Sequence, residues 1–378
     1  MHLILGADVC PINKNEQVFS SGVIAQETID FLAAYDLRIA NLECPLIVGE
    51  PPATDNCGVE LWTQATARFG LKKLGFDLLS LANNHIMDCG VAGMKSTIQA
   101  LQDVGIPFLG VGDSLEEAAR PHTLRCQDNE IMVFAFTEHY FSAVSPNRSG
   151  ANYLEVPHIA RSLLAAPSHL FKLVLLHGGS EGCAFPSPVL RDICHFIIEL
   201  GAHAVIVQHT HCLGAYETYR DGLIVYGQGN FIFDYPTDDH SIWTLGALLD
   251  LEIDRNRLVG FQFVPFRQEP GPSLFRILTH GERQEAIDTI QKYHAILASP
   301  EAYGQEWNRF CQSRRHSYNQ FFSSHGRWYN KLRKILTKII PLPDEIPREK
   351  QKRIFQALRC VSRLEELKTH FFNGLQDQ

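Results

Sequence analysis

The sequence lacks an apolar run long enough to span a bilayer. No stretch of its 378 residues approaches the roughly 20 apolar residues that a membrane-spanning helix needs. The first five residues are too short for the apolar core of a signal peptide, carry no basic start and lead directly into polar residues 6–8. We therefore expect a cytoplasmic protein.

Cysteine pairs with metal-binding spacing are also absent. The chain holds 10 cysteines, but none form a Cys-x-x-Cys pair, and their spacing matches no disulfide framework or structural zinc site. Free thiols in a reducing compartment are the state that this pattern favours. We also find no internal repeat.

The chain as a whole has no excess of positive charge, because its formal net charge is -8. The average hides a division along the chain. Residues 309–378 hold 15 Lys and Arg against 6 Asp and Glu, whereas residues 1–308 hold 19 against 36. An acidic body would repel nucleic-acid phosphates, so we exclude nucleic acid as a partner.

The first 265 residues alternate short apolar runs with amphipathic helical patterns. Strands are predicted at Leu3–Leu5, Leu78–Ala82, Ile131–Phe136, Leu173–Leu176, Ala204–Val207 and Leu223–Tyr226. Helices are predicted over 91–104 and 188–200, and each is followed by a glycine stop. Buried strands separated by helices indicate an α/β fold.

The chain changes character after residue 241. Residues 243–253 and 258–266 are β-rich and predict a hairpin, and a Pro/Gly cluster at 269–272 marks a boundary. We predict one domain over 1–268 and a helical, basic C-terminal extension over 269–378. Amphipathic helices over 326–340 and 347–372 either dock on the acidic body, which we favour, or bind a partner protein or the inner face of the membrane.

Polar residues of metal-binding types follow five of the apolar runs. They are Asp8, Asn41 and Glu43, then Asn83, Asn84, His85 and Asp88, then His177, and finally His209 and His211. Ligands of open α/β sheets bind at the carboxyl ends of the strands. Carboxylates, an amide oxygen and several imidazoles suit two divalent ions such as Mn, Zn or Fe. Two metals about 3.5–4 Å apart can activate a water and clamp a phosphoryl or acyl centre.

These residues lie in motifs that resemble those of the CapA family, which is named for poly-γ-glutamate capsule synthesis. The motifs are Gly6-Ala7-Asp8, Asn41-Leu42-Glu43, Ala82-Asn83-Asn84-His85-x-x-Asp88-x-Gly90, His177-Gly178-Gly179-x-Glu181, His209-x-His211 and Gly229-Asn230-Phe231-x-Phe233-Asp234. The family is related to the calcineurin-like metallophosphoesterases. The resemblance implies a four-layer α/β/β/α sandwich with a dinuclear metal site.

The resemblance also implies a role for each residue. Asp8 and His211 would bind one metal, Asn84, His177 and His209 the second, and Glu43 would bridge both. His85 would be the general acid or would stabilise the transition state, and Asp88 would orient it. Glu181 would act either behind the ligands or on the substrate.

One motif departs from the related phosphoesterases, which carry Asp-x-His at the first strand. Here the sequence is Asp8-Val9-Cys10. Cys10 could replace that histidine, because a thiolate is a good ligand for Zn or Fe. The alternative is a small apolar residue at a crowded strand end.

Several candidates also have structural interpretations. Asn83 and Asn84 could cap the helix near residue 91. We interpret Asp234 as structural and Glu217 as a residue of a solvated strand edge. Metallo-β-lactamase-like sites need His-x-His-x-Asp-His, which the residues after His211 do not match, and amidohydrolase barrels place their His-x-His at the first strand.

The sequence thus predicts a metal-dependent hydrolase that cleaves a phosphoester or a γ-glutamyl amide bond during synthesis of a capsule or other extracellular polymer. The alternative is a non-catalytic accessory protein that binds polymer or partner enzymes with the same fold.

Overall fold

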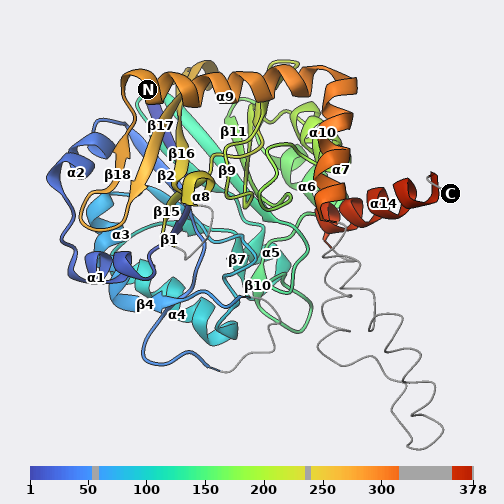
Figure 1. Ribbon diagram of the computed structural model, residues 1–378. Coiled ribbons are helices and arrows are strands. Elements are labelled where there is room, and N and C mark those ends of the chain that lie inside the picture. The colour runs from blue at the N-terminus through green and yellow to red at the C-terminus, as the bar shows by residue number, and fades with distance from the viewer. Residues whose placement is uncertain (53–58, 235–239, 315–359, 377–378) are drawn as a thin grey trace, which may run out of the picture.

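A computed structural model describes residues 1–52, 59–234, 240–314 and 360–376 (Figure 1). Within these ranges the chain forms two main β-sheets, two small two-stranded sheets and flanking helices. The predicted helix over 326–340 and the first part of the one over 347–372 lie outside the described residues.

The first main sheet has eight strands and is mixed. Its order is β18-β17-β16-β1-β2-β5-β6, and β15 also pairs with β1. The strands are β1 (His2–Cys10), β2 (Leu37–Leu42), β5 (Leu78–Ser80), β6 (Phe108–Leu109), β15 (Asn230–Phe233), β16 (Leu245–Asp254), β17 (Arg257–Glu269) and β18 (Leu274–Ile277). β1, β2, β5, β6 and β15 pair in parallel, whereas β16, β17 and β18 add an antiparallel edge.

The second main sheet has six strands in the order β13-β14-β12-β11-β9-β8. The strands are β8 (His122–Cys126), β9 (Asn129–Thr137), β11 (Phe171–His177), β12 (Ala204–Gln208), β13 (Tyr216–Tyr219) and β14 (Gly222–Val225). The central four, β9, β11, β12 and β14, are parallel. The small sheets pair β3 (Leu46–Ile47) with β4 (Thr63–Gln64) and β7 (Val111–Gly112) with β10 (Gly150–Ala151).

Helices connect the strands and cover the sheets. They are α1 (Lys14–Ser21), α2 (Gln26–Ala33), η1 (Ala65–Ala67), α3 (Arg68–Leu74), α4 (Gly90–Asp103), α5 (Leu115–Ala118), α6 (Val156–Ala165), α7 (Pro188–Glu199), α8 (His240–Thr244), α9 (His280–Ala298), α10 (Pro300–Ser313) and α14 (Val361–Gln376). Local sequence sets their ends. In α7, Pro188 occupies the first turn and the Ser187 side chain accepts a hydrogen bond from the Leu190 amide.

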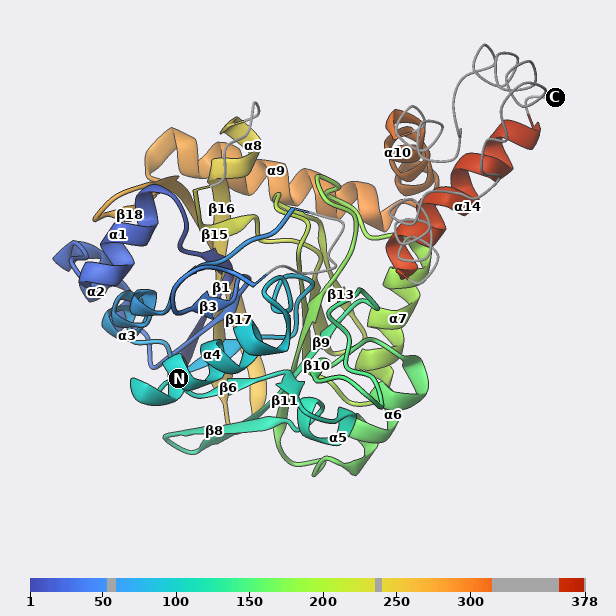
Figure 2. The same ribbon diagram turned by 90° about the horizontal axis from the view of Figure 1, so that it is seen from below.

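Alternation along the strands divides the apolar residues into three cores. Leu3 and Leu5 of β1 pack between the sheets against residues of the second sheet such as Leu175. Ile4 points the other way, toward the layer that includes Phe19 of α1. In the second sheet, Leu176 packs outward against residues of α7 and α10. Figure 2 shows α1, α2 and α3 on one side of the strands and α6 and α7 on the other.

The three cores therefore make a four-layer α/β/β/α sandwich, as predicted. The hairpin is also present, as β16 and β17. The first sheet continues past the Pro/Gly cluster, because β18 pairs with β17 beyond residue 268. The division into two domains remains a prediction.

From His280 onward, the described part of the C-terminal region is helical, and it contacts the sandwich. α9 lies along the sheets, α10 follows it after Ser299, and α14 contacts α10 and α7 (Figure 1). Cys360 and Leu367 are buried there, at 0% and 3% exposure. Among the described helices, none is both long enough and apolar enough to cross a membrane.

Candidate metal centre

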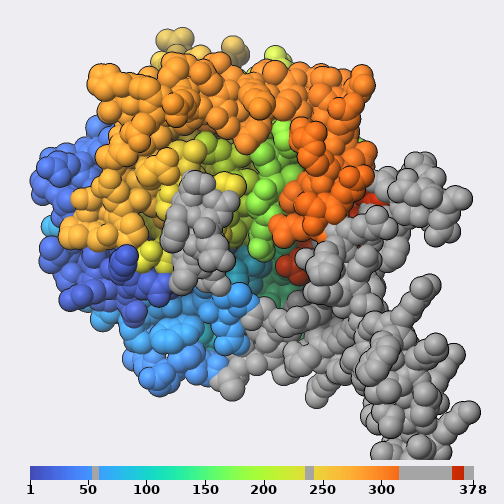
Figure 3. Space-filling model, in the orientation of Figure 1, coloured from blue at the N-terminus to red at the C-terminus, as the bar shows by residue number. Residues whose placement is uncertain are grey.

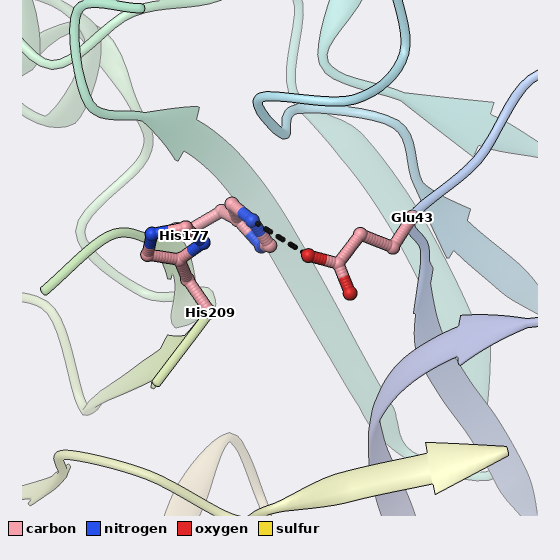
Figure 4. Close-up of side chains that lie close together, drawn as sticks. All are labelled: Glu43, His177 and His209. Carbon is pink, nitrogen blue, oxygen red and sulfur yellow. Dashed lines mark ion pairs between the residues drawn. The ribbon is translucent and has the colours of Figure 1, made fainter. Parts of the chain in front are cut away.

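The side chains that the motifs single out come together where parallel strands of both sheets end. Asp8 lies near the end of β1, and Glu43 follows β2 directly. His177 is the last residue of β11, and His209 follows β12. All four are at most 2% exposed. Figure 4 shows Glu43 reaching from one sheet toward His177 and His209 of the other, so the centre needs both sheets.

These residues form two groups that could each hold a divalent ion. One comprises Glu43, His177 and His209, and the other Asp8, Glu43 and His211, with ligand atoms within 4.8 Å of one another. Glu43 Oε1 lies 3.4 Å from His177 Nε2 and 3.8 Å from His211 Nε2. Glu43 is the residue that the two groups share.

The chemistry of Glu43 fits bound cations. Its side chain is fully buried, and neither carboxylate oxygen has a hydrogen-bond partner among the described residues. A buried carboxylate without donors is costly unless it is paired or coordinates a metal. The Nδ1 atom of His209 is likewise buried without a partner. The donor set of each group therefore fits a divalent ion.

Burial sets the protonation of these ligands. It raises the pKa of Asp8 to about 6, with the nearby Glu43 carboxylate adding to the effect. It lowers the pKa of His177 to about 3 and also lowers that of His209, so both imidazoles are neutral and able to bind metal. For His211, burial is outweighed by the charges of Glu43 and Asp8, and the pKa rises.

Three asparagines hold the ligands in place. Asn84 Oδ1 lies 2.7 Å from His177 Nε2, which places its amide oxygen beside the first group. Asn41 donates to Asp8 Oδ1 at 2.8 Å. Asn230 Oδ1 lies 2.8 Å from His211 Nδ1 and would accept a hydrogen bond from a protonated Nδ1. This tautomer leaves the lone pair of Nε2 facing Glu43. Sequence reasoning noted Asn41 and Asn230 in the motifs but gave them no role.

His85 and Asp88 form a pair beside the two groups. His85 Nδ1 lies 2.6 Å from Asp88 Oδ2, and the side chains are 15% and 0% exposed. Burial alone would lower the pKa of His85, but the hydrogen bond and the charge of Asp88 raise it above 6.5. Asp88 also accepts from the Leu61 amide at 2.8 Å, which fixes its orientation. The partly open imidazole can thus carry a proton next to the centre.

The backbone conformation that places His209 and His211 in the site was not predicted from the sequence. Alternation along a strand would point both rings the same way, but β12 ends at Gln208, before either histidine. His209 and His211 instead have positive φ angles of 92° and 55°. This conformation is costly for residues with a Cβ and is typical of functional sites. It brings the two rings to a centroid separation of 5.7 Å.

Glu181 and Tyr140 lie on the His209 side of the centre. Glu181 Oε1 is 3.8 Å from His209 Nε2, and its side chain is 53% exposed. Glu181 therefore lies where the centre meets solvent. The Tyr140 hydroxyl is 3.1 Å from the same nitrogen. Sequence reasoning missed Tyr140, although it follows the end of β9 as other site residues follow their strands.

Cys10 lies outside both groups of ligand atoms found among the described residues. It is 0% exposed and belongs to the core between the first sheet and its helices. Burial, and then a hydrogen bond with Cys44, raise the pKa of its thiol well above the usual value. The packing thus favours the apolar interpretation, and metal ligation by Cys10 stays a prediction.

Glu217 lies on the edge strand β13, but it is not solvated, so that part of the interpretation is wrong. Its side chain is only 12% exposed. Arg191 donates to both carboxylate oxygens, and Tyr226 donates at 2.7 Å. His195 Nε2 lies 2.8 Å from the same carboxylate. Asp234 accepts hydrogen bonds from the start of α1, which agrees with its structural interpretation.

Comparison with known proteins relates the chain to capsule biosynthesis. It is 26% identical over 265 residues to the capsule biosynthesis protein CapA of Bacillus anthracis, covering 67% of this chain and 63% of that protein. It is 26% identical over 239 residues to the PGA biosynthesis protein CapA of Bacillus subtilis, covering 61% of each. The chain thus matches somewhat under two thirds of the length of these relatives.

Among solved structures, a novel phosphatase from Mycoplasma pneumoniae superposes with a TM-score of 0.44 and 12% identity, covering 72% of this chain and 95% of that one. The model of the family described as bacterial capsule synthesis protein PGA_cap matches residues 4–235. This range is more than half of the chain and contains both groups of candidate ligand side chains. The chain therefore belongs to the PGA_cap family of bacterial capsule synthesis proteins.

Proposed function

We propose that this protein is a hydrolase that uses two divalent ions, Mn, Zn or Fe, during synthesis of a capsule or other extracellular polymer. The observation that carries the proposal is the Glu43 carboxylate, which is shared by two candidate ligand groups and has no hydrogen-bond partner in the described part of the chain. The biosynthetic setting is suggested by the names of the Bacillus relatives.

Each residue of the centre has a part in this proposal. Asp8, Glu43, Asn84, His177, His209 and His211 would hold the ions. When bound, two such ions supply Lewis acidity toward water and toward an oxygen of a phosphoryl or acyl centre. His85, oriented by Asp88, would donate a proton to the leaving group.

The scissile bond is either a phosphoester or a γ-glutamyl amide. Both reactions pass through a centre with developing negative charge on oxygen, which cations stabilise. Purified protein supplied with Mn, Zn or Fe should be assayed in parallel against a phosphomonoester, a phosphodiester and γ-glutamyl oligomers. The substrate that is turned over identifies the bond that the protein cleaves.

The site assignment is tested by metal content. A His209→Ala/His211→Ala variant should retain far less metal than the wild type, whereas His122→Gln, on the edge strand β8, should retain the wild-type amount. Wild-type metal content in the double variant would refute the assignment. Full metal content without turnover in any arm, and capsule function that survives His85→Ala, would favour the accessory protein instead.

A further inference from the structure

A buried hydrogen-bond network of four side chains connects the candidate ligand His209 to the start of the C-terminal helix. The Tyr140 hydroxyl lies 3.1 Å from His209 Nε2 and also forms a hydrogen bond with the Cys360 thiol. The thiol lies 2.6 Å from Glu138 Oε2. All four residues are at most 7% exposed. The proposed chemistry uses only His209, so the other three need another explanation.

Glu138 ends the network as an acceptor. It follows β9 directly, and its amide donates to the backbone oxygen of His177 at 2.9 Å. Its carboxylate accepts hydrogen bonds from the Gly179 amide at 2.9 Å and from the Ser362 amide and hydroxyl at 3.1 Å and 2.5 Å. A carboxylate has acceptor sites only. The Cys360 thiol is therefore the donor in its hydrogen bond with Glu138.

This assignment fixes the direction of every other bond in the network. Cys360 has one thiol proton and donates it to Glu138, so its sulfur accepts from the Tyr140 hydroxyl. Tyr140 has thus donated its only polar proton, and its oxygen accepts from His209 Nε2. The network therefore places the ring proton of the neutral His209 imidazole on Nε2.

The other ring nitrogen of His209 agrees with this tautomer. Nδ1 is buried and has no hydrogen-bond partner among the described residues. A buried N–H without an acceptor is costly, whereas an unprotonated nitrogen offers its lone pair to a cation. His209 belongs to the candidate ligand group that includes Glu43 and His177. Histidines that bind metals donate their second ring N–H to a fixed partner, and here Tyr140 is that partner.

The docking of α14 fixes the far end of the network. The Ser180 hydroxyl donates to Glu366 Oε1 at 2.5 Å, and the Trp307 indole of α10 donates to the Thr369 hydroxyl at 3.2 Å. Figures 1 and 2 both show α14 beginning beside the end of α10. In the space-filling view only small parts of α14 are visible below α10 (Figure 3). Cys360 directly precedes α14, so the docked helix brings the thiol to Tyr140.

We propose that Tyr140 and Cys360 are positioning residues, which hold His209 in the tautomer that presents an unprotonated Nδ1 to the metal. This inference rests on the proposed function for the identity of the metal centre. The opposite tautomer would require the Tyr140 hydroxyl to donate to Nε2, and the Cys360 sulfur would then lose its donor. The C-terminal helix thereby contributes to the site through the orientation of one ligand.

The tautomer is tested by nitrogen NMR of the metal-free, full-length protein with ¹⁵N-labelled histidine. The His209 signals are those that are missing from His209→Gln. The wild type should carry its proton on Nε2. Cys360→Ala removes the acceptor of the Tyr140 hydroxyl, which can then donate to Nε2, so part of the His209 population should move its proton to Nδ1. Cys360→Ser keeps one donor and one acceptor and should keep the wild-type tautomer. A wild type protonated on Nδ1 would overturn the inference.

Metal affinity gives a second measurement, made with Mn by competition against a chelating dye. Tyr140→Phe keeps the ring but removes the acceptor, so it should weaken Mn binding about tenfold to a hundredfold. Tyr303→Phe is the matched control and should bind Mn as the wild type does. It also removes one hydroxyl hydrogen bond, to the Pro186 carbonyl, from a buried tyrosine that is 8% exposed against 7% for Tyr140.

A double-mutant cycle separates the network from general packing of the helix. Cys360→Ala should weaken Mn binding several-fold in the wild type but not in the Tyr140→Phe background, since both changes act through one hydroxyl. Equal losses in both backgrounds, or wild-type Mn affinity in Tyr140→Phe, would overturn this inference alone. A wild type that binds no metal would instead refute the proposed function, and the tautomer of its His209 would still test the network.

Discussion

Glu43 is a side chain that destabilises the metal-free protein. Burial raises its pKa, and within the described ranges its oxygens have no hydrogen-bond donors. The folded state therefore disfavours the charged form, and this cost grows as the pH rises above the value at which the unfolded chain ionises. We expect Glu43→Gln to stabilise the metal-free protein by about 1–3 kcal/mol at pH 7.5.

The measurement is the Tm of metal-free and metal-loaded samples. Added metal should raise the Tm of the wild type but have little effect on Glu43→Gln, since the variant has lost the bridging ligand. Glu130→Gln, which changes a partly exposed carboxylate paired with Arg125, is the control. A metal-free Glu43→Gln protein that melts below the wild type would contradict the argument.

Asp8 makes metal binding depend on pH. Its pKa is raised to about 6 in the metal-free protein, so binding must displace its proton below that pH. His211, whose pKa is also raised, contributes a second proton. Affinity for Mn should therefore increase by at least about tenfold per pH unit up to pH 6 and level off above neutrality. Titration from pH 5 to pH 8 measures this, and a constant affinity would contradict it.

Asp88 should act on turnover through His85. Its charge and hydrogen bond raise the pKa of His85, so Asp88→Asn should lower that pKa. The protonated form would then be lost at lower pH, and the basic limb of the pH–rate profile should move to lower pH. We expect kcat to fall roughly tenfold to a hundredfold with little change in metal content. An unchanged profile would mean that Asp88 does not orient or charge His85.

Residue types at strand ends singled out the candidate ligands, and the family resemblance divided them between two metals. Asp8, Glu43 and His177 lie where parallel strands deliver them, so pattern and position agree. The backbone of the His209–His211 segment could not be predicted, because positive φ angles depend on long-range packing. Tyr140 was missed for a different reason. A single tyrosine after a strand belongs to no repeating pattern that would mark it as a site residue.

At the scale of single elements, Glu217 links β13 to α7 and β14. Burial opposes its ionisation, but hydrogen bonds from Arg191, Tyr226 and His195 outweigh this and lower its pKa below 4.5. A lowered pKa in the folded state stabilises the protein above pH 4.5, and this contribution is lost as the pH falls through the folded value. Partial exposure screens the effect.

Glu217→Gln should therefore destabilise the protein by about 2 kcal/mol at pH 7 and by progressively less as the pH falls below 4.5. Urea unfolding at pH 7 and at acid pH measures the difference. Glu199→Gln is the control, because its ion pair with Arg220 is more exposed, at 34% and 60%. A cost that is the same at both pH values would show that the charge of Glu217 is not what stabilises these elements.

The elements of the sandwich were predictable because each strand and helix carries its own pattern. β11 and β12 are continuous apolar runs, and α7 has a cap, an apolar face and a glycine after its end. β18 was missed because four residues after a Pro/Gly cluster carry too little periodicity. Glu138 contacts Cys360 and Ser362, which lie 222 and 224 positions further along the chain. No local sequence pattern encodes contacts over such distances.

At the scale of the whole molecule, the C-terminal helix and the sandwich stabilise each other through Glu138. Without residues 360–378, this buried carboxylate would keep only the Gly179 amide as a donor in the described part of the chain. Trp307 and Cys311 of α10 would also lose neighbours in the core that they share with Val361. Deleting 360–378 should therefore destabilise the protein by about 2–5 kcal/mol, because a buried charge loses its partners.

Making the deletion in a Glu138→Gln background shows whether this loss of stability comes from the Glu138 contact or from apolar packing. A neutral amide is less costly to leave without donors than a carboxylate, so the deletion should lower the Tm less in this background than in the wild type. Measurements on metal-loaded samples exclude a secondary effect through the ligands, since Glu138 contacts the loop after His177. If the deletion lowers the Tm equally in both backgrounds, then apolar packing rather than the Glu138 contact holds α14 on the sandwich. A smaller loss in the Glu138→Gln background would instead establish that the basic C-terminal region is attached to the acidic body at one buried carboxylate beside the metal centre.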